Sequence, residues 1–299
     1  MKLLISGSTG LVGSTLVQAV AANKDDVYRL VRKKNDSSEK TVLWNPSDGQ
    51  LNPADIEGFD AVIHLAGESI AAGRWTDQQK AKIRDSRVNG TTLLSKTLAS
   101  LKQPPKVLVS ASAIGIYGDR GDELLNENSK PGTGFLVDVC REWEAAAEPA
   151  EQRGIRTVKL RFGMILSPTG GALGKMLTPF RMGVGGIIGS GNQYISWITI
   201  DDVVGIIQES LKNDSLKGPV NTVTPNPVTN REFTKTLGKV LGRLTIFPVP
   251  SFGARLAFGQ MADELLLASQ RVEPARLKSA GYQFRFPNLE GALRHVLNK

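Results

Sequence analysis

Three glycines near the start of the chain have the spacing of a phosphate-binding turn. Gly7, Gly10 and Gly13 have two residues between each, and they lie between an apolar run and a helical pattern. A pyrophosphate needs a tight turn without side-chain obstruction, followed by backbone N–H groups at the positive end of a helix, and glycine permits both. We expect a dinucleotide at this turn, with contacts from Gly7, Ser8, Thr9, Gly10, Leu11, Val12 and Gly13.

A basic cluster after the second apolar run indicates which dinucleotide binds. Arg32, Lys33 and Lys34 stand where an NAD-binding protein commonly has a carboxylate for the ribose 2′-hydroxyl. A carboxylate would repel a 2′-phosphate, whereas an arginine fork can bind it with two charge-assisted hydrogen bonds. The cluster therefore favours NADP(H); the alternative is a solvated basic loop.

The single cysteine, Cys140, lies in a segment with helical periodicity. Phe135, Val139 and Trp143 recur every four residues, and Leu136 and Cys140 lie on the adjoining row, which predicts an amphipathic helix. A free cysteine on such a face is most often a small hydrophobic residue. The alternative is a thiol that faces a ligand site.

These groups need a scaffold, and the order of apolar runs and helical patterns predicts one. Expected strands at 2–6, 26–32, 60–67, 106–112 and 156–166 alternate with expected helices at 11–22, 76–101 and around Cys140. Strands separated by helices of this length imply right-handed βαβ units and a parallel sheet. We expect an α/β fold, a Rossmann-type doubly wound sheet with a smaller C-terminal unit on the substrate side.

The domain boundaries follow from changes in composition. Residues 1–166 form the expected NADP-binding domain, and 194–224, which resumes as strand and helix, completes its core. Residues 167–193 are rich in glycine, which suits a shaped loop over a substrate better than a regular core element. Residues 225–299 are the expected C-terminal unit.

Composition excludes several classes of function. The formal charge of +8 raises nucleic acid as a partner, but the basic residues are scattered among 29 acids and aromatic residues are only 6%. A small anionic ligand explains the excess as well. One cysteine rules out an intrachain disulfide. No uncharged apolar segment approaches the roughly 20 residues that span a bilayer, and SGSTG interrupts the apolar N-terminal run, so we expect a cytoplasmic protein without a membrane partner.

Several strings together resemble the extended short-chain dehydrogenase/reductases. They are the glycine turn, HLAG at 64–67, RVNGT at 87–91, SASAIGIYGD at 110–119 and SWITIDDV at 196–203. The strings LAGESIAAGRW, CREWEAAA, GGALGKMLTPFRMGVGGIIGSGNQYISWI and SQRVEPARLKSAGYQF are similar to an atypical, nucleoside-diphosphate-sugar epimerase-like branch with its own C-terminal unit. The resemblance covers almost the whole chain.

The resemblance also implies further cofactor contacts. Leu65, Ala66 and Gly67 would line the adenosine side, and Ile165 lies in a segment that would meet the nicotinamide end. Arg87 stands where the superfamily has asparagine and would add a cation near the phosphates; its alternative role is an ion pair on the helix surface.

The catalytic residues that the resemblance implies are only partly present. Ser112 matches the serine at the end of the fifth strand, with Ser110 as the alternative in another register, but the Tyr-x-x-x-Lys positions hold Leu136 and Cys140. In the superfamily the tyrosine is the general acid/base, and the lysine lowers its pKa. An enzyme would need a substitute, and Tyr117 is the first candidate, with Glu68, Ser69 or a Cys140 thiolate as others. Tyr117 could equally pack against the turn at Gly118.

Other chemical groups carry less weight. His64 and His295 are expected to be structural, and no cluster of His, Cys, Asp and Glu has metal-ligand spacing. The leading hypothesis is an NADP(H)-binding epimerase or oxidoreductase with a polar, nucleotide- or sugar-like substrate, as a monomer or homodimer. Its expected pocket residues are Glu68, Arg74, Trp75, Lys175, Arg181, Gln193 and Trp197. The alternative is a dinucleotide-binding regulator with a protein partner, connected with cell division.

Overall fold

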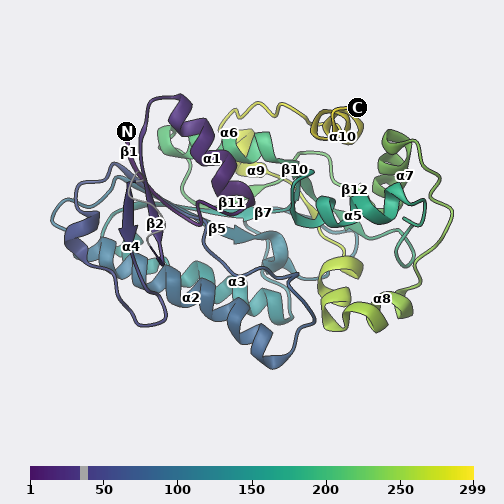
Figure 1. Cartoon of the computed structure of the whole chain (residues 1–299), viewed down its shortest axis with the longest axis horizontal. Helices are drawn as coiled ribbons and strands as arrows, with labels where there is room; N and C mark the ends of the chain where they lie inside the picture. The colour runs from purple at the N-terminus through teal and green to yellow at the C-terminus, as the bar shows by residue number, and fades with distance from the viewer. Residues whose placement is uncertain (34–39) are drawn as a thin grey trace.

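A seven-stranded sheet forms the centre of the molecule (Figure 1). The computed structural model describes residues 1–33 and 40–299. The sheet has the order β11-β7-β5-β4-β1-β2-β3, and every neighbouring pair is parallel. Its strands are β1 (Lys2–Ser6), β2 (Asp26–Val31), β3 (Thr41–Leu43), β4 (Ala61–His64), β5 (Val107–Ala113), β7 (Arg156–Phe162) and β11 (Gly218–Thr222). The chain order reverses between β1 and β4, which is where α/β sheets of this type bind ligands.

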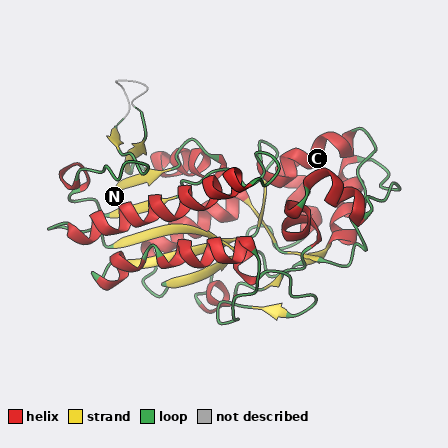
Figure 2. Ribbon diagram, turned by 90° about the horizontal axis from the view of Figure 1, so that it is seen from below, coloured by secondary structure: helices red, strands yellow, loops and turns green. Residues whose placement is uncertain are grey.

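Helices cover both faces of the sheet (Figure 2). α1 (Leu11–Ala22) and α6 (Ile200–Lys212) pack on one face, and α2 (Asp77–Ser100), α3 (Phe135–Ala145) and α4 (Glu148–Gln152) pack on the other. Successive strand residues point to opposite faces, so Leu3 and Ile5 join the core under α1 and α6, while Leu4 joins the core under α2. The predicted doubly wound α/β fold is confirmed.

The expected strand 156–166 is two strands. β7 ends at Phe162, and β8 (Met164–Leu166) leaves the main sheet to pair with β10 (Trp197–Thr199). Gly163 separates them, and a Cβ at this position would lie 2.5 Å from the Ser196 carbonyl oxygen. Only glycine therefore fits where the chain crosses so close to a neighbouring backbone.

The prediction that 167–193 forms a loop is wrong for its middle part. Helix α5 (Gly171–Arg181) occupies it, with Leu173, Leu177 and Phe180 buried along one side. Burial of these three side chains outweighs the low helix propensity of the glycines.

The last quarter of the chain adds further helices, most of them at one end of the sheet, while α9 packs beside β11 (Figure 1). They are α7 (Asn230–Leu241), α8 (Ser251–Phe258), the π-helical turn η3 (Ala262–Leu267), α9 (Ala275–Ser279) and α10 (Leu289–Leu297). α5, α7 and α10 share one apolar core with Trp197. Two short strand pairs tie this unit to the rest, β12 (Val228–Thr229) with β9 (Tyr194–Ile195) and β13 (Arg271–Val272) with β6 (Leu124–Leu125). The domain boundaries given above remain predictions.

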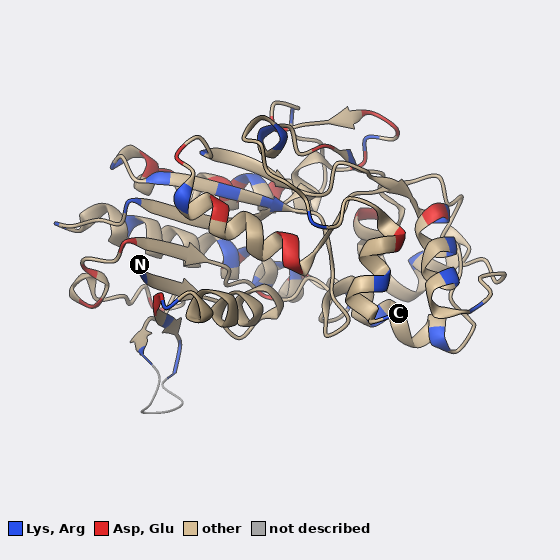
Figure 3. Ribbon diagram, turned by 90° about the horizontal axis from the view of Figure 1, so that it is seen from above, with Lys and Arg blue, Asp and Glu red and all other residues tan. Residues whose placement is uncertain are grey.

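Charged side chains of both signs are dispersed over the molecule. Lys and Arg, and also Asp and Glu, occur at each end of the molecule (Figure 3). Within residues 1–33 and 40–299, no helix combines the length and the apolar character needed to span a membrane.

Candidate functional site

The glycine turn between β1 and α1 is shaped by close backbone contacts. Gly7 has φ +67°, and a Cβ there would lie 2.6 Å from the backbone carbon of Leu65. A Cβ on Gly13 would lie 2.1 Å from the Gly7 carbonyl oxygen. Larger residues would therefore force the turn apart. The contact with Leu65 also joins the turn to the segment after β4, which was predicted to line the same cofactor.

The N-terminus of α1 is open to an anion. Gly10 is the N-cap residue, no side chain caps the helix, and its first turn contains no acidic residue. The first N–H groups of a helix lack intrahelical partners and carry partial positive charge. Thr9 and Gly10 are exposed, whereas Ser8 is buried. The residues present therefore fit a dinucleotide pyrophosphate.

The basic residues after β2 lie at the same edge as the glycine turn. β2 pairs in parallel with β1, so Arg32 and Lys33 follow β2 where the turn follows β1, and both are exposed. Lys34, the third member of the predicted cluster, lies outside the described residues. The edge can therefore offer cations to a phosphate beside the adenosine.

Arg87 lies on α2 next to the end of β4. Its guanidinium carbon is 3.4 Å from the place of a Cβ on Gly67, and Nη1 donates to the Ile83 carbonyl oxygen at 3.0 Å. Its Cζ also lies 5.0 Å from the ring centre of Trp143 on α3. Burial lowers the pKa of Arg87. The predicted neighbours Gly67 and Arg87 are therefore in contact.

Two of the predicted catalytic side chains, Ser112 and Tyr117, belong to a buried hydrogen-bond network. Ser112 Oγ donates to Glu144 Oε1 at 2.7 Å, and Arg161 forms a two-pronged ion pair with Glu144 at 2.8 and 2.9 Å. Arg161 Nη1 donates to the Tyr117 hydroxyl at 2.9 Å, and that hydroxyl lies 2.7 Å from Asn221 Oδ1. Burial raises the pKa of Tyr117, although Arg161 opposes the shift.

Tyr117 therefore does not present a free phenol at the carboxyl edge of the sheet, as was expected. Its side chain has no exposed surface, and its hydroxyl is hydrogen-bonded to Arg161 and Asn221 inside the fold. A role for Tyr117 in catalysis stays a prediction. Ser112 is also buried, at the end of β5.

Cys140 is a packed residue. It is 3% exposed and belongs to an apolar cluster with Ile114, Ile116 and Tyr117. Burial raises its pKa to about 12, so the thiol is protonated at neutral pH. The structure therefore does not support a Cys140 thiolate.

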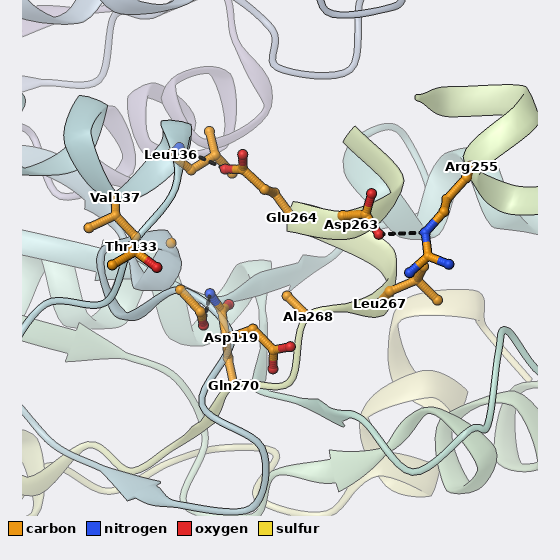
Figure 4. A pocket seen from close by; sticks show the side chains of 12 residues that line it. Asp119, Thr133, Leu136, Val137, Arg255, Asp263, Glu264, Leu267, Ala268 and Gln270 are labelled. Atoms are coloured by element: carbon orange, nitrogen blue, oxygen red, sulfur yellow. Dashed lines mark hydrogen bonds and ion pairs between the residues drawn. The ribbon is translucent and has the colours of Figure 1, made fainter. Parts of the chain in front are cut away.

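A pocket of about 300 Å³ adjoins the N-terminus of α3 (Figure 4). Leu136, which occupies the expected tyrosine position, lines the pocket, as does Gly115, whereas Cys140 does not. A Cβ on Gly115 would lie 3.7 Å from the Cys140 Sγ. The remaining lining residues are Gly118, Asp119, Thr133, Val137, Arg255, Asp263, Glu264, Leu267, Ala268 and Gln270. The pocket is thus shared between the end of β5, α3 and the C-terminal unit.

Glu264 connects the C-terminal unit to α3. Its Oε1 accepts from the Phe135 N–H at 3.2 Å and its Oε2 accepts from the Leu136 N–H at 2.8 Å. Gly134, the N-cap residue, has φ +124° and provides no side chain for this task. A carboxylate from 128 residues away therefore caps the helix.

None of the seven predicted pocket residues lines this pocket. Arg74 donates to the carbonyl oxygens of Leu256 and Ala257, and Lys175 donates to that of Ala71. Trp75 donates to the Ile70 carbonyl oxygen at 2.8 Å and packs against Phe135. These side chains hold neighbouring segments together.

The other four lie elsewhere. Trp197 has no exposed surface and belongs to the core of α5, α7 and α10, so the prediction that it lines an open pocket is wrong. Gln193 is buried and donates to the carbonyl oxygens of Ile188 and Leu266, both at 3.0 Å. Glu68 and Arg181 are exposed.

Several residues at the pocket and in the network could hardly be predicted from the sequence. Glu264, Arg255 and Gln270 come from the C-terminal unit, and only the family-like string that begins at Ser269 indicated that this part mattered. The Arg161–Glu144 pair was missed because it joins β7 to α3 across the fold.

Two further predictions concern histidines and metals. His64 is buried and hydrogen-bonded between Ser6 and Thr91, and burial lowers its pKa to about 4, so it is a neutral structural residue as expected. His295 lies 3.2 Å from Asp201 and stacks on Phe286. Among the residues that the structure describes, no group of three or more His, Cys, Asp or Glu side chains could hold a metal ion.

A doubly wound sheet with a glycine turn and an uncapped helix at its switch point defines a dinucleotide-binding protein of the Rossmann class. The comparison with known proteins agrees. Residues 3–222 match the NAD dependent epimerase/dehydratase family, and residues 249–296 match a domain of unknown function, DUF1731. The chain belongs to the NAD dependent epimerase/dehydratase family.

Three relatives show how far the similarity extends. An epimerase family protein of Mycobacterium tuberculosis is 42% identical over 295 residues, which are 99% of this chain and 97% of that one. The crystal structure of the human epimerase family protein SDR39U1 with NADPH is 34% identical, with a TM-score of 0.91 and full coverage of both chains. A nucleoside-diphosphate sugar epimerase from Corynebacterium glutamicum is 37% identical with a TM-score of 0.81, covering 99% of this chain and 57% of that one.

Proposed function

We propose that the protein binds NADP(H) at the glycine turn and acts as an epimerase or oxidoreductase on a polar substrate. One observation carries the dinucleotide site: α1 begins at an uncapped glycine, and the turn before it admits no Cβ at Gly7 or Gly13. Bare N–H groups next to a backbone without side chains suit a pyrophosphate. The NADPH in the human relative, which is similar over its whole length, supports the proposal.

The 2′-phosphate would bind to Arg32 and Lys33. Arg32→Asp should weaken NADPH binding about 10-fold or more and leave NADH binding within about 2-fold, because the aspartate removes a cation and repels only the ligand with the extra phosphate. Fluorescence titration with both nucleotides measures this. Lys235→Asp, on an exposed position of α7, makes the same charge change away from the turn and serves as control. Equal weakening of both nucleotides would rule out the 2′-phosphate assignment.

The substrate would lie in the pocket beside Leu136. The dinucleotide supplies or accepts a hydride when bound. Leu136, Val137 and Leu267 would exclude water from one wall, while Asp119 and Gln270 would accept or donate hydrogen bonds to the substrate. A pocket whose lining is half polar, with both acidic and basic side chains, suits a hydroxyl-bearing, nucleotide- or sugar-like compound.

A second function has its own support, a dinucleotide-binding regulator with a protein partner. Leucine at 136, a neutral thiol at 140 and a buried Tyr117 leave the predicted proton carriers without access to the pocket. NADPH oxidation across a panel of carbonyl compounds and nucleotide sugars distinguishes the two. The enzyme is supported if one of these compounds is turned over and Leu136→Trp abolishes the turnover by filling the pocket. The variant should still bind NADPH. Tight NADPH binding with no oxidation of any compound favours the regulator.

A further inference from the structure

Arg87 is a partly buried cation without an ion-pair partner among the described residues, and the Glu68 carboxylate acts on it only from beyond ion-pair distance. The described residues place no carboxylate within ion-pair distance of its guanidinium, and burial lowers its pKa. The neighbouring Arg84, one turn earlier on the same helix, pairs with Asp85 and Glu142. A guanidinium has five N–H donors, and in Arg87 the described partners include one acceptor, the Ile83 carbonyl oxygen. Such a group is costly to bury unless something else neutralises it.

A second unused donor lies beside it. Trp143, 7% exposed, forms one side of the Arg87 site, and its indole Nε1 is buried with no hydrogen-bond partner among the described residues. Buried polar groups are normally satisfied, so an exception calls for an explanation. The Arg87 guanidinium packs over the Trp143 ring with N–H groups that have no described acceptor, and an acceptor-rich ligand would complete this contact between α2 and α3, which we call the seam.

The position of the seam suggests which part of the ligand it meets. Arg87 Nη2 lies 3.5 Å from the place of a Cβ on Gly67, three residues beyond the end of β4, and Gly67 is exposed. β4 lies between β1, which carries the glycine turn, and β5, which leads to the pocket. A dinucleotide that extends from the turn to the pocket would cross this point with its second half.

The buried face of α3 provides no cation at position 140, and Arg141, the next residue, is exposed. Cys140, one turn before Trp143, is neutral because burial raises the pKa of its thiol to about 12. The resemblance described above would place a lysine at this position. Arg87 reaches the same seam from α2, through its contact with Trp143.

We infer that Arg87 binds the nicotinamide-side ribose and phosphate of the dinucleotide, and so supplies from α2 the positive charge that position 140 of α3 lacks. This rests on the proposed binding of NADP(H). It differs from a contact with the adenosine half, which Arg32 and Lys33 would hold.

The test compares NADPH with adenosine 2′,5′-bisphosphate, which has the adenosine half and its 2′-phosphate but no nicotinamide half. Arg87→Met should weaken NADPH binding about 10- to 100-fold, since charge-assisted bonds are lost, and change bisphosphate binding by less than about 2-fold. Arg87→Lys, which keeps the charge but not the fork, should lose less NADPH affinity than Arg87→Met. Arg84→Met, whose charge is paired and exposed, is the matched control and should bind both ligands like the wild type.

The outcomes separate this inference from the proposed function. Bisphosphate binding by Arg87→Met shows that the variant is folded. Equal losses for both ligands, or no loss for NADPH, would overturn the role of Arg87 while leaving NADP(H) binding by the wild type intact. If the wild type binds neither ligand, the proposed function and the inference fail together. If Arg87→Met does not fold, Arg87→Lys replaces it in the test. Weaker binding of NADPH with unchanged binding of the bisphosphate would then support the role of Arg87, and equal binding changes would overturn it.

Discussion

Three largely buried polar residues at the ends of β5, β7 and α3 bind to each other. Glu144 accepts from Ser112 and pairs with Arg161, and both charged side chains are largely buried. Burial opposes the charge on Arg161, but the Glu144 carboxylate outweighs it and the pKa of the guanidinium is raised. Neighbouring β5 and β7 bring Ser112 next to Arg161 in register. This network fixes the end of β5 under the pocket.

Removing one charge from the network should destabilise the protein. Glu144→Gln should lower the free energy of unfolding by about 3 kcal/mol, because Arg161 would remain buried without a carboxylate. Denaturant titration measures the change. Glu142→Gln, on the same helix but in an exposed pair with Arg84, should cost about 0.5 kcal/mol or less. Equal effects of the two substitutions would show that the buried pair contributes no more than a surface pair.

At the scale of elements, the strands of the sheet and the helices that cover it could be predicted from periodicity. Helix α5 was not predicted, because its segment is rich in glycine. Leu173, Leu177 and Phe180 do follow helical spacing, and this signal was outweighed by the number of glycines around them. The break at Gly163 was also invisible, because it depends on the close approach of Ser196. Local sequence patterns predict a helix or strand that has one buried face. They fail where contacts with a distant part of the chain determine the local structure.

Helix α3 depends on a cap from the C-terminal unit. Glu264→Ala should lower the free energy of unfolding by about 1 kcal/mol, because the N–H groups of Phe135 and Leu136 lose their acceptor. Thermal or denaturant unfolding gives the change. Asp263→Ala, which removes an exposed partner of Arg255, is the control and should have a smaller effect. If both substitutions cost the same, the cap would not contribute to stability.

At the scale of the whole molecule, the sequence predicts which segments meet at the carboxyl edge of the sheet but does not predict the pocket, and the individual cofactor contacts stay a prediction. The glycine turn, Arg32, Leu65, Gly67 and their neighbours converge because the ends of parallel strands meet at one edge. The pocket beside Leu136 needs η3 and α8, which lie more than 100 residues later and reach it only when the C-terminal unit docks. No spacing in the sequence reports that docking, so Arg255, Asp263 and Glu264 were not predicted to line a pocket.

The affinity of the wild-type chain for NADPH and NADH tests the central proposal most directly. Calorimetric titration of the purified protein should show one site per chain and NADPH binding about 10-fold or more tighter than NADH, because only NADPH carries the 2′-phosphate for Arg32 and Lys33. Failure to bind either nucleotide, or affinity for NADH equal to or greater than that for NADPH, would contradict it.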